Sequence, residues 1–209
     1  APGMQYVRDY AASLGAESAI QDKQLGTGHA ALCAQSVLGD FSGAILINNG
    51  DMPLARAEMM AESLASAEKQ GLSIVAFRPA DAAAYGRVIL GSDGLLDRIV
   101  EFKDANAEER AVDLCCAGTY SAADARRFFE WASKLGNHNA QGDYYLPEVP
   151  LVAKKDAVRS AVTVADEITV MGVNSRAELA DAEAQMQKRL RAAALANGVG
   201  MVAPETVFL

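Results

Sequence analysis

Short apolar segments that alternate with a helical pattern are the feature of this sequence that most restricts its fold. Residues 44–47 are apolar throughout, and residues 73–77 have the character of a second strand buried on both faces. Between them, residues 56–70 have the apolar spacing of an amphipathic helix, which Gly71 is placed to end. A strand–helix–strand order is typical of α/β proteins, so we predict a three-layer α/β fold with a mixed, mostly parallel sheet.

A hairpin pattern interrupts this alternation. Residues 86–90 and 95–101 favour strands, and the Gly-Ser-Asp-Gly sequence between them is typical of a turn. We therefore expect a small β insertion around residues 86–101. Earlier in the chain, residues 18–20 suggest a short strand, and residues 27–37 suggest a helix with its first residue as the N-cap.

The C-terminal part of the chain continues the alternation. Residues 158–164 favour a strand, and residues 176–197 favour a long Ala-rich helix that Gly198 closes. The last residues, 199–209, lack periodicity. A chain of 209 residues can bury roughly 70% of its unfolded surface. We therefore expect one domain over residues 1–198 and the beginning of a linker over residues 199–209.

Charge and cysteine content argue against several classes of protein. The 19 Lys and Arg residues against 27 Asp and Glu residues give a net charge of −8, which disfavours nucleic acid and anionic membranes as partners. No apolar run approaches the length of a membrane span, and no signal-peptide pattern follows Ala1. The 3 cysteines lack the spacing of a zinc site. We therefore expect a cytoplasmic protein.

Two loops at the ends of predicted strands are candidates for binding or catalysis. Residues 21–30 combine glycines with the start of a predicted helix, which suits an anion or a carbonyl group, although an ordinary tight turn has the same pattern. Residues 48–53 place Asp51 directly after the buried strand, where a carboxylate can hold a divalent metal. An Asp in a common turn is the alternative. For the charged cluster within residues 101–104, solvated charges at a strand end are the simpler interpretation.

Six sequence motifs are distributed in order over most of the chain. The motifs are Q-D-K-Q-L-G-T-G-H-A at 21–30, G-D-M-P-L at 50–54, Y-G-R-V at 85–88, I-V-E-F-K-D-A at 99–105, N-A-Q-G-D-Y-Y-L at 139–146 and G-V-N-S-R-A-E-L at 172–179. Taken together, they resemble one family, the uridylyltransferase domain of the bacterial bifunctional enzyme that makes UDP-N-acetylglucosamine. Residues 203–209 resemble the linker into that family's β-helix acetyltransferase domain. Six ordered motifs are far more specific than a single glycine-rich loop.

The resemblance implies a Rossmann-like nucleotidyltransferase fold of the glycosyltransferase-A type and a metal-assisted reaction. In that reaction, N-acetylglucosamine-1-phosphate attacks the α-phosphorus of UTP, pyrophosphate leaves, and a precursor of the peptidoglycan and lipopolysaccharide of the cell envelope forms. By resemblance, Asp51 and Asn174 would be catalytic and would hold Mg²⁺. The residues implied in substrate binding are Gln21, Gly26 and Thr27 at the uracil, Gly86 and Glu101 at the sugar, and also Gly50 and Cys116.

Departures from the family pattern leave alternatives open. Cys116 stands in the place of a sugar-binding Asn and cannot replace both functions of an amide, so a related sugar-1-phosphate is an alternative substrate. The family's N-terminal glycine-rich loop, which holds the triphosphate, is not among the motifs of this sequence. We therefore expect the chain by itself to release little pyrophosphate. A catalytically degenerate relative that binds nucleotide sugars is the other alternative, and no oligomeric state is predicted.

Overall fold

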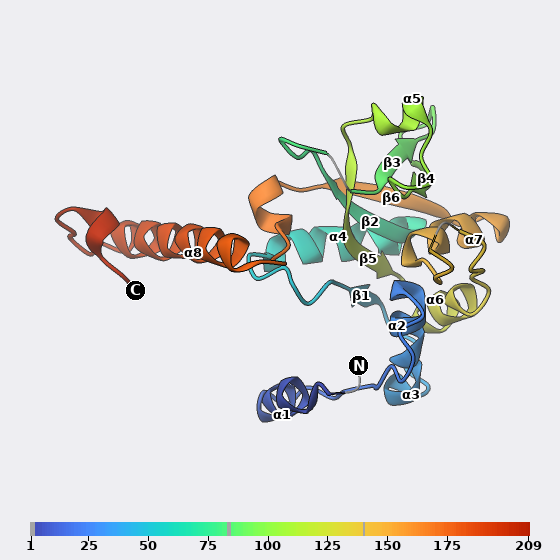
Figure 1. Cartoon of the computed structure of the whole chain (residues 1–209), viewed down its shortest axis with the longest axis horizontal. Coiled ribbons are helices and arrows are strands. Elements are labelled where there is room, and N and C mark those ends of the chain that lie inside the picture. The colour runs from blue at the N-terminus through green and yellow to red at the C-terminus, as the bar shows by residue number, and fades with distance from the viewer. Residues whose placement is uncertain (1–2, 83–84, 140) are drawn as a thin grey trace.

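A six-stranded sheet organises the computed structural model of the chain, which describes residues 3–82, 85–139 and 141–209 (Figure 1). Residue 140, within the motif at 139–146, lies outside the described residues. The strands are β1 (Ile45–Ile47), β2 (Gly71–Phe77), β3 (Arg87–Leu90), β4 (Leu96–Val100), β5 (Cys115–Ala122) and β6 (Arg159–Val164). The helices are α1 (Gln5–Ser13), α2 (Thr27–Cys33), α3 (Gln35–Leu38), α4 (Ala57–Gln70), α5 (Ala107–Arg110), α6 (Ala125–Ala132), α7 (Val149–Lys155) and α8 (Arg176–Ala196), with 3₁₀ helices η1 (Leu146–Glu148), η2 (Glu167–Val170) and η3 (Pro204–Thr206).

The sheet is mixed, as expected, but the prediction that it is mostly parallel is wrong. The strand order is β4-β3-β5-β2-β6, and β1 pairs with β5 off this path. Among the described residues, only the pairing of β2 with β6 is parallel, and the pairings of β5 with β1, β2 and β3 are all antiparallel. The β3–β4 hairpin reverses the chain before β5, which then inserts between β3 and β2 and runs opposite to both.

Two apolar cores on opposite faces of the sheet make the fold a three-layer sandwich, as predicted. Helix α4 covers one face, where Met59 packs in a cluster with Val75. Helices α6 and α7 cover the other face, where Phe128 and Trp131 pack with Ile74. Successive strand residues point to opposite faces, and Ile74 and Val75 are both fully buried. The apolar run predicted as a strand buried on both faces is therefore confirmed for β2.

The prediction of a strand buried on both faces is wrong for β1. Its residues are only half-buried, and in the described chain it is bonded along one edge, to Ser121 and its neighbours in β5. The predicted β hairpin is confirmed, because Arg87 lies opposite Val100 and Val88 opposite Ile99. It is part of the main sheet rather than a separate unit, because β3 also pairs with β5.

The N-terminal segments contain two corrections. The strand predicted at residues 18–20 is absent, because this stretch is exposed and pairs with no other strand in the described part of the chain. The helix predicted at residues 27–37 is divided into α2 and α3 at Ala34. Its N-cap is Gly26 rather than Thr27, and the Thr27 hydroxyl instead accepts a hydrogen bond from the Leu146 backbone N–H at 3.1 Å.

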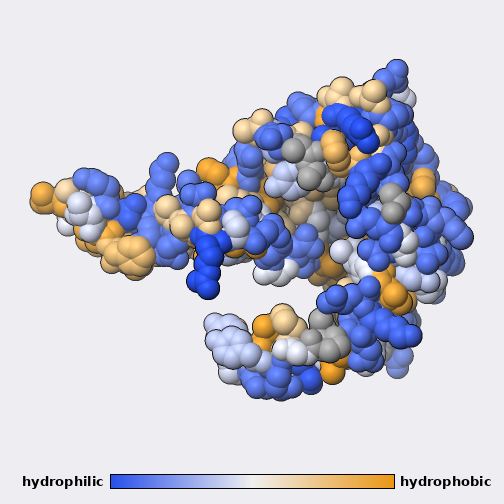
Figure 2. Space-filling view, viewed as in Figure 1, coloured by the Kyte–Doolittle hydropathy of each residue, from blue (hydrophilic) through white to orange (hydrophobic). Residues whose placement is uncertain are grey.

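The two ends of the chain extend away from the sheet. Helix α1 has no buried residue, and an open space separates it from the main body (Figures 1 and 2). Helix α8 also projects away from the sheet, and the last residues turn back along it (Figure 1). In the described residues, no helix combines the length and apolar character needed to cross a membrane.

Candidate active site

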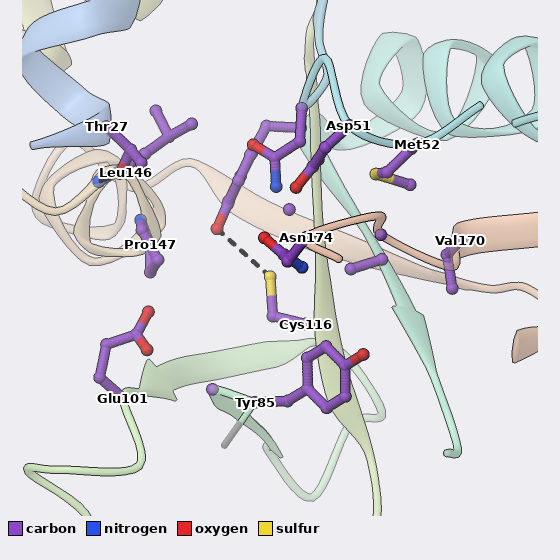
Figure 3. A pocket seen from close by; sticks show the side chains of 16 residues that line it. Thr27, Asp51, Met52, Tyr85, Glu101, Cys116, Leu146, Pro147, Val170 and Asn174 are labelled. Atoms are coloured by element: carbon purple, nitrogen blue, oxygen red, sulfur yellow. Dashed lines mark hydrogen bonds between the residues drawn. The ribbon is translucent and has the colours of Figure 1, made fainter. Parts of the chain in front are cut away.

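A pocket of about 260 Å³ lies where loops from distant parts of the chain meet (Figure 3). Its walls come from the start of α2, the loop after β1, the segments flanking the β3–β4 hairpin, β5, η1, and the end of η2 with the segment after it. Six residues implied by the family resemblance line it, namely Thr27, Asp51, Gly86, Glu101, Cys116 and Asn174.

Asp51 and Asn174 approach the same corner of this pocket from separate loops (Figure 3). A Cβ atom built at Gly172 would lie 3.6 Å from Asp51 Oδ2 and 3.8 Å from Asn174 Nδ2, so both side chains border one small space. The Val173 backbone N–H donates to the Asp51 carbonyl at 2.9 Å, and the Asn174 N–H donates to Glu178 Oε2 at 2.6 Å. These bonds tie the two loops to each other and to the start of α8.

This pair suits a hard divalent cation, because carboxylate and amide oxygens are the ligands that Mg²⁺ prefers. The protein donor set is small. The described residues contain no group of three or more His, Cys, Asp and Glu side chains placed to hold a metal ion. Asp51 and Asn174 could therefore bind Mg²⁺ only together with water and substrate phosphates, an arrangement that is common for this ion.

Cys116 and Tyr120 form a neutral wall on the β5 side of the pocket. The Cys116 Sγ and Tyr120 Oη atoms are hydrogen-bonded at 3.2 Å (Figure 3). Burial raises the pKa of the Cys116 thiol to about 11 and raises the pKa of Tyr120 well above its ordinary value. Both groups are therefore protonated at neutral pH, and the wall offers polar contacts without charge.

Glu101 supplies a partly buried carboxylate on the hairpin side. Burial raises its pKa, and the nearby Asp104 carboxylate raises it further. A Cβ atom built at Gly86 would lie 3.4 Å from Glu101 Oε1, so the missing side chain at Gly86 leaves space beside the carboxylate. This carboxylate can accept hydrogen bonds from hydroxyl groups of a bound molecule.

Arg87, to which the sequence reasoning assigned no role, fixes the segment before β3. Its side chain is almost fully buried, and its Nη1 donates to the carbonyls of Ala82 at 2.7 Å and Tyr85 at 2.5 Å. Its guanidinium also lies 5.4 Å from the centroid of the Phe102 ring. Arg87 therefore positions Tyr85 and Gly86 at the pocket, and its place in the motif at 85–88 was the available signal.

The loop implied in uracil recognition is only partly at the pocket. Gln21 Nε2 donates to the Gly26 carbonyl at 3.1 Å and lies 3.0 Å from His29 Nδ1, so its amide is turned toward its own loop. Gly26 has φ +99°, and a Cβ atom there would lie 2.7 Å from the Tyr144 carbonyl oxygen. Of Gln21, Gly26 and Thr27, only Thr27 lines the pocket, and Gly50 borders an adjacent apolar hollow instead.

Sequence reasoning missed several pocket residues on β5 and the loop after β1. Gly118 has φ +82°, and a Cβ atom there would collide with the Asn49 amide. The Thr119 hydroxyl donates to Asn48 Oδ1, which ties β5 to the same loop. The position of Gly118 inside the stretch that forms β5 was a detectable signal, because a glycine in a strand often marks a close approach. The role of Tyr120 depends on a contact that only the folded chain makes.

The comparison with solved structures identifies the fold. A nucleoside-diphosphate-sugar pyrophosphorylase from Vibrio cholerae matches with a TM-score of 0.61 at 13% sequence identity, over 85% of this chain and 74% of that one. At this identity the likeness shows the fold, which is a Rossmann-like nucleotidyltransferase fold. No protein-family model matches the chain.

The comparison with curated proteins gives matches of higher sequence identity. The chain is 44% identical over 209 residues to a protein named bifunctional protein GlmU from Rhizorhabdus wittichii and 47% identical over 203 residues to the protein of the same name from Maricaulis maris. These matches cover 99% and 97% of this chain but 46% and 45% of the relatives. The chain therefore matches one part of GlmU proteins, as the motifs indicated, and spans about half the length of the curated relatives it matches.

Proposed function

We propose that this chain is a uridylyltransferase that forms UDP-N-acetylglucosamine and pyrophosphate from UTP and N-acetylglucosamine-1-phosphate. The observation that carries the proposal is the 44–47% identity to GlmU proteins across nearly the whole chain. The pocket supports it, because it gathers Asp51, Asn174, Gly86 and Glu101 from four separate segments. We further propose that the protein acts in the cytoplasm, as part of cell-envelope precursor synthesis.

In this proposal, Asp51 and Asn174 hold Mg²⁺ beside the reacting phosphates. The bound ion would supply charge neutralisation at the phosphate oxygens. The chain's own contribution is to keep the two side chains in place through the Val173–Asp51 backbone bond and the bond from Asn174 to Glu178. Such prior positioning lowers the entropic cost of bringing the substrates together.

The sugar and the base would lie on opposite sides of the pair. Glu101 would accept hydrogen bonds from sugar hydroxyl groups, with Gly86 leaving room and Cys116 forming the neutral wall. Thr27 would border the base, and the Gln21 amide would exchange its present bonds for the edge of the uracil. A site that hydrogen-bonds one base edge discriminates against another, because its polar groups would be left without partners. The role of Gly50 remains a prediction.

A second candidate function is nucleotide-sugar binding without turnover. Among the described residues that line the pocket, none is Lys or Arg. The triphosphate of UTP and the departing pyrophosphate each carry several negative charges, which such sites normally stabilise with cations. This observation favours binding of a UDP-sugar over rapid pyrophosphate release by this chain.

Calorimetric titration with UDP-N-acetylglucosamine in the presence of Mg²⁺ tests the site. We expect Asp51→Asn to weaken binding about tenfold or more, because the metal loses its anionic protein ligand. Asp40→Asn, an exposed carboxylate outside the pocket, is the matched control and should bind as the unchanged chain does. An adenosine-diphosphate sugar should bind about a hundredfold more weakly. Equal affinity for the uridine and adenosine compounds would contradict the proposal.

A pyrophosphate-release assay with UTP separates the two candidate functions. If the chain releases pyrophosphate with N-acetylglucosamine-1-phosphate and Asp51→Asn abolishes this release, the result supports the uridylyltransferase. Binding of UDP-N-acetylglucosamine with release at background supports the non-catalytic relative. Faster release with glucose-1-phosphate than with the N-acetylated sugar would show that the Cys116 wall accepts a different substrate.

A further inference from the structure

A second hollow, which shares no lining residue with the candidate active site, gathers cationic side chains. It has a volume of about 480 Å³ and is bordered by α8, by the residue before α4 and by η2. Arg56, Lys188 and Arg189 all line it. None of the three is joined to a carboxylate by an ion pair within the ranges that the structure describes. The family resemblance assigned no role to these residues.

Arg189 borders this hollow and has one buried hydrogen-bond donor without a partner within the described part of the chain. Its Nη1 donates to the Leu54 carbonyl at 2.8 Å, whereas its Nη2 is buried and has no hydrogen-bond partner. Burial lowers the pKa of Arg189, and the positive charge of Arg56 lowers it further. A guanidinium stays charged at neutral pH, so two like charges lie near one another, and neither forms an ion pair in the described residues.

The two carboxylates that line the hollow form no ion pair with these cations in the described residues. Both oxygens of Glu167 accept the Ala80 backbone N–H at 3.2 Å. Asp166 also lines the hollow. Three cations and two carboxylates therefore leave an excess of positive charge in the hollow.

We propose that this hollow binds a small phosphate-class dianion, which Arg56 and Lys188 contact directly and which the Arg189 charge supports from beneath. The side chains of Arg56 and Lys188 are exposed and can donate to an oxyanion without rearrangement of the fold. Two accessible cations match a dianion better than a monoanion such as a carboxylate. The volume is sufficient for inorganic phosphate or pyrophosphate.

The proposed site borders the segment that carries the candidate metal ligand. Leu54, the carbonyl partner of Arg189, lies three residues after Asp51 and is almost fully buried. Occupancy of the hollow would reduce the repulsion between Arg56 and Arg189 and so stabilise this segment. The proposal does not depend on the uridylyltransferase function, because its residues lie outside the pocket of that function.

The test is a titration of the full chain, followed by backbone NMR, with inorganic phosphate, pyrophosphate and acetate at constant ionic strength. We expect phosphate and pyrophosphate to shift the signals of residues 54–57 and 185–192, with acetate giving much weaker binding. Comparing the affinities for phosphate and pyrophosphate identifies which of the two anions the hollow prefers. Arg56→Gln and Lys188→Gln should each weaken binding about tenfold, corresponding to the loss of one charge-assisted hydrogen bond.

Arg126→Gln is the matched control, because Arg126 is exposed on α6, away from the hollow, and should leave the affinity unchanged. In phosphate-free buffer, Arg56→Gln should melt at or above the temperature of the unchanged chain, since it removes a repulsion. Equal affinity of the unchanged chain and the Arg56→Gln variant for phosphate would overturn the proposal. So would shifts confined to the pocket of Asp51, or acetate binding as strong as that of phosphate.

Discussion

Glu101 illustrates how the pocket shapes the chemistry of a single residue. Burial raises the pKa of this carboxyl above its ordinary value, with a further contribution from the charge of Asp104. The folded chain therefore holds the proton more tightly than the unfolded chain does. The stability linked to this group is fully present below the ordinary pKa and is lost as the pH rises through the raised pKa.

We predict that Glu101→Gln melts a few degrees higher than the unchanged chain at pH 7, because it removes the cost of a buried charge. The difference should vanish below about pH 4, where both states of the unchanged chain are protonated. Thermal melts at the two pH values measure this. Glu130→Gln, an exposed carboxylate on α6, is the control and should show no pH-dependent gain. A lower melting temperature for Glu101→Gln at both pH values would contradict the prediction.

Gly26 is a residue where backbone conformation and close approach both require glycine. Its φ is +99°, and an added Cβ would meet the Tyr144 carbonyl oxygen at 2.7 Å. We expect Gly26→Ala to lower the free energy of unfolding by about 2 kcal/mol or more. Gly94→Ala, at φ +77° with nothing within 4 Å, isolates the conformational part and should cost about 1 kcal/mol. Urea denaturation of the two variants gives the comparison, and equal losses would show that the contact with Tyr144 costs nothing.

At the scale of elements, a buried pair of hydroxyls joins α4 to the centre of the sheet. Ser63 on α4 and Ser121 on β5 are hydrogen-bonded at 2.8 Å, and both are fully buried. No water can replace a lost partner there, so each serine depends on the other. The pair therefore adds specificity to the packing of α4, which also contributes Met59 to the apolar cluster on this face of the sheet.

We predict that Ser63→Ala and Ser121→Ala each lower the free energy of unfolding by about 1–3 kcal/mol, because each leaves one buried hydroxyl unpaired. The double variant should cost less than the two single variants together, since no unpaired hydroxyl remains. Chemical denaturation of all four forms gives a double-mutant cycle. Additive losses would mean that the hydrogen bond contributes little.

At the scale of the whole molecule, residues 199–209, predicted as the beginning of a linker, turn back along α8. Gln187 is almost fully buried, and its amide donates to the Leu209 carbonyl at 2.6 Å and accepts the Leu209 N–H at 2.8 Å. Arg191 also donates to the Val207 carbonyl at 3.1 Å. The side chain of Gln187 thus pairs with the backbone of Leu209 as a neighbouring strand would. The assignment of residues 199–209 to a linker stays a prediction.

Removing this pairing should release the end of the described chain while leaving the sheet intact. We expect Gln187→Ala to speed amide hydrogen exchange at residues 206–209 about fivefold, as the loss of about 1 kcal/mol implies. Exchange in β2 should be unchanged. Gln185→Ala, two residues earlier on the same helix, serves as the control, because in the described residues Gln185 makes no hydrogen bond to Leu209. Unchanged exchange at residues 206–209 would show that Arg191 and the apolar contacts hold the segment alone.

The sequence by itself determined the α/β class, the doubly buried β2, the β3–β4 hairpin and the long helix α8, because these depend on local periodicity and turn residues. Motif order identified the family, which the similarity to GlmU proteins confirms. It also named six residues that the folded chain brings to one pocket, although their roles remain proposals.

Only the tertiary structure decided the rest, because it depends on which segments meet. The antiparallel course of β5 through the sheet arises from the pairing of strands distant in sequence, which no local pattern encodes. The absence of a strand at residues 18–20 depends likewise on pairing, because this stretch pairs with no other strand in the described residues. The bond between Cys116 and Tyr120 and the unpaired charge of Arg189 exist only where the fold buries these groups together, since burial, rather than residue type, sets their chemistry.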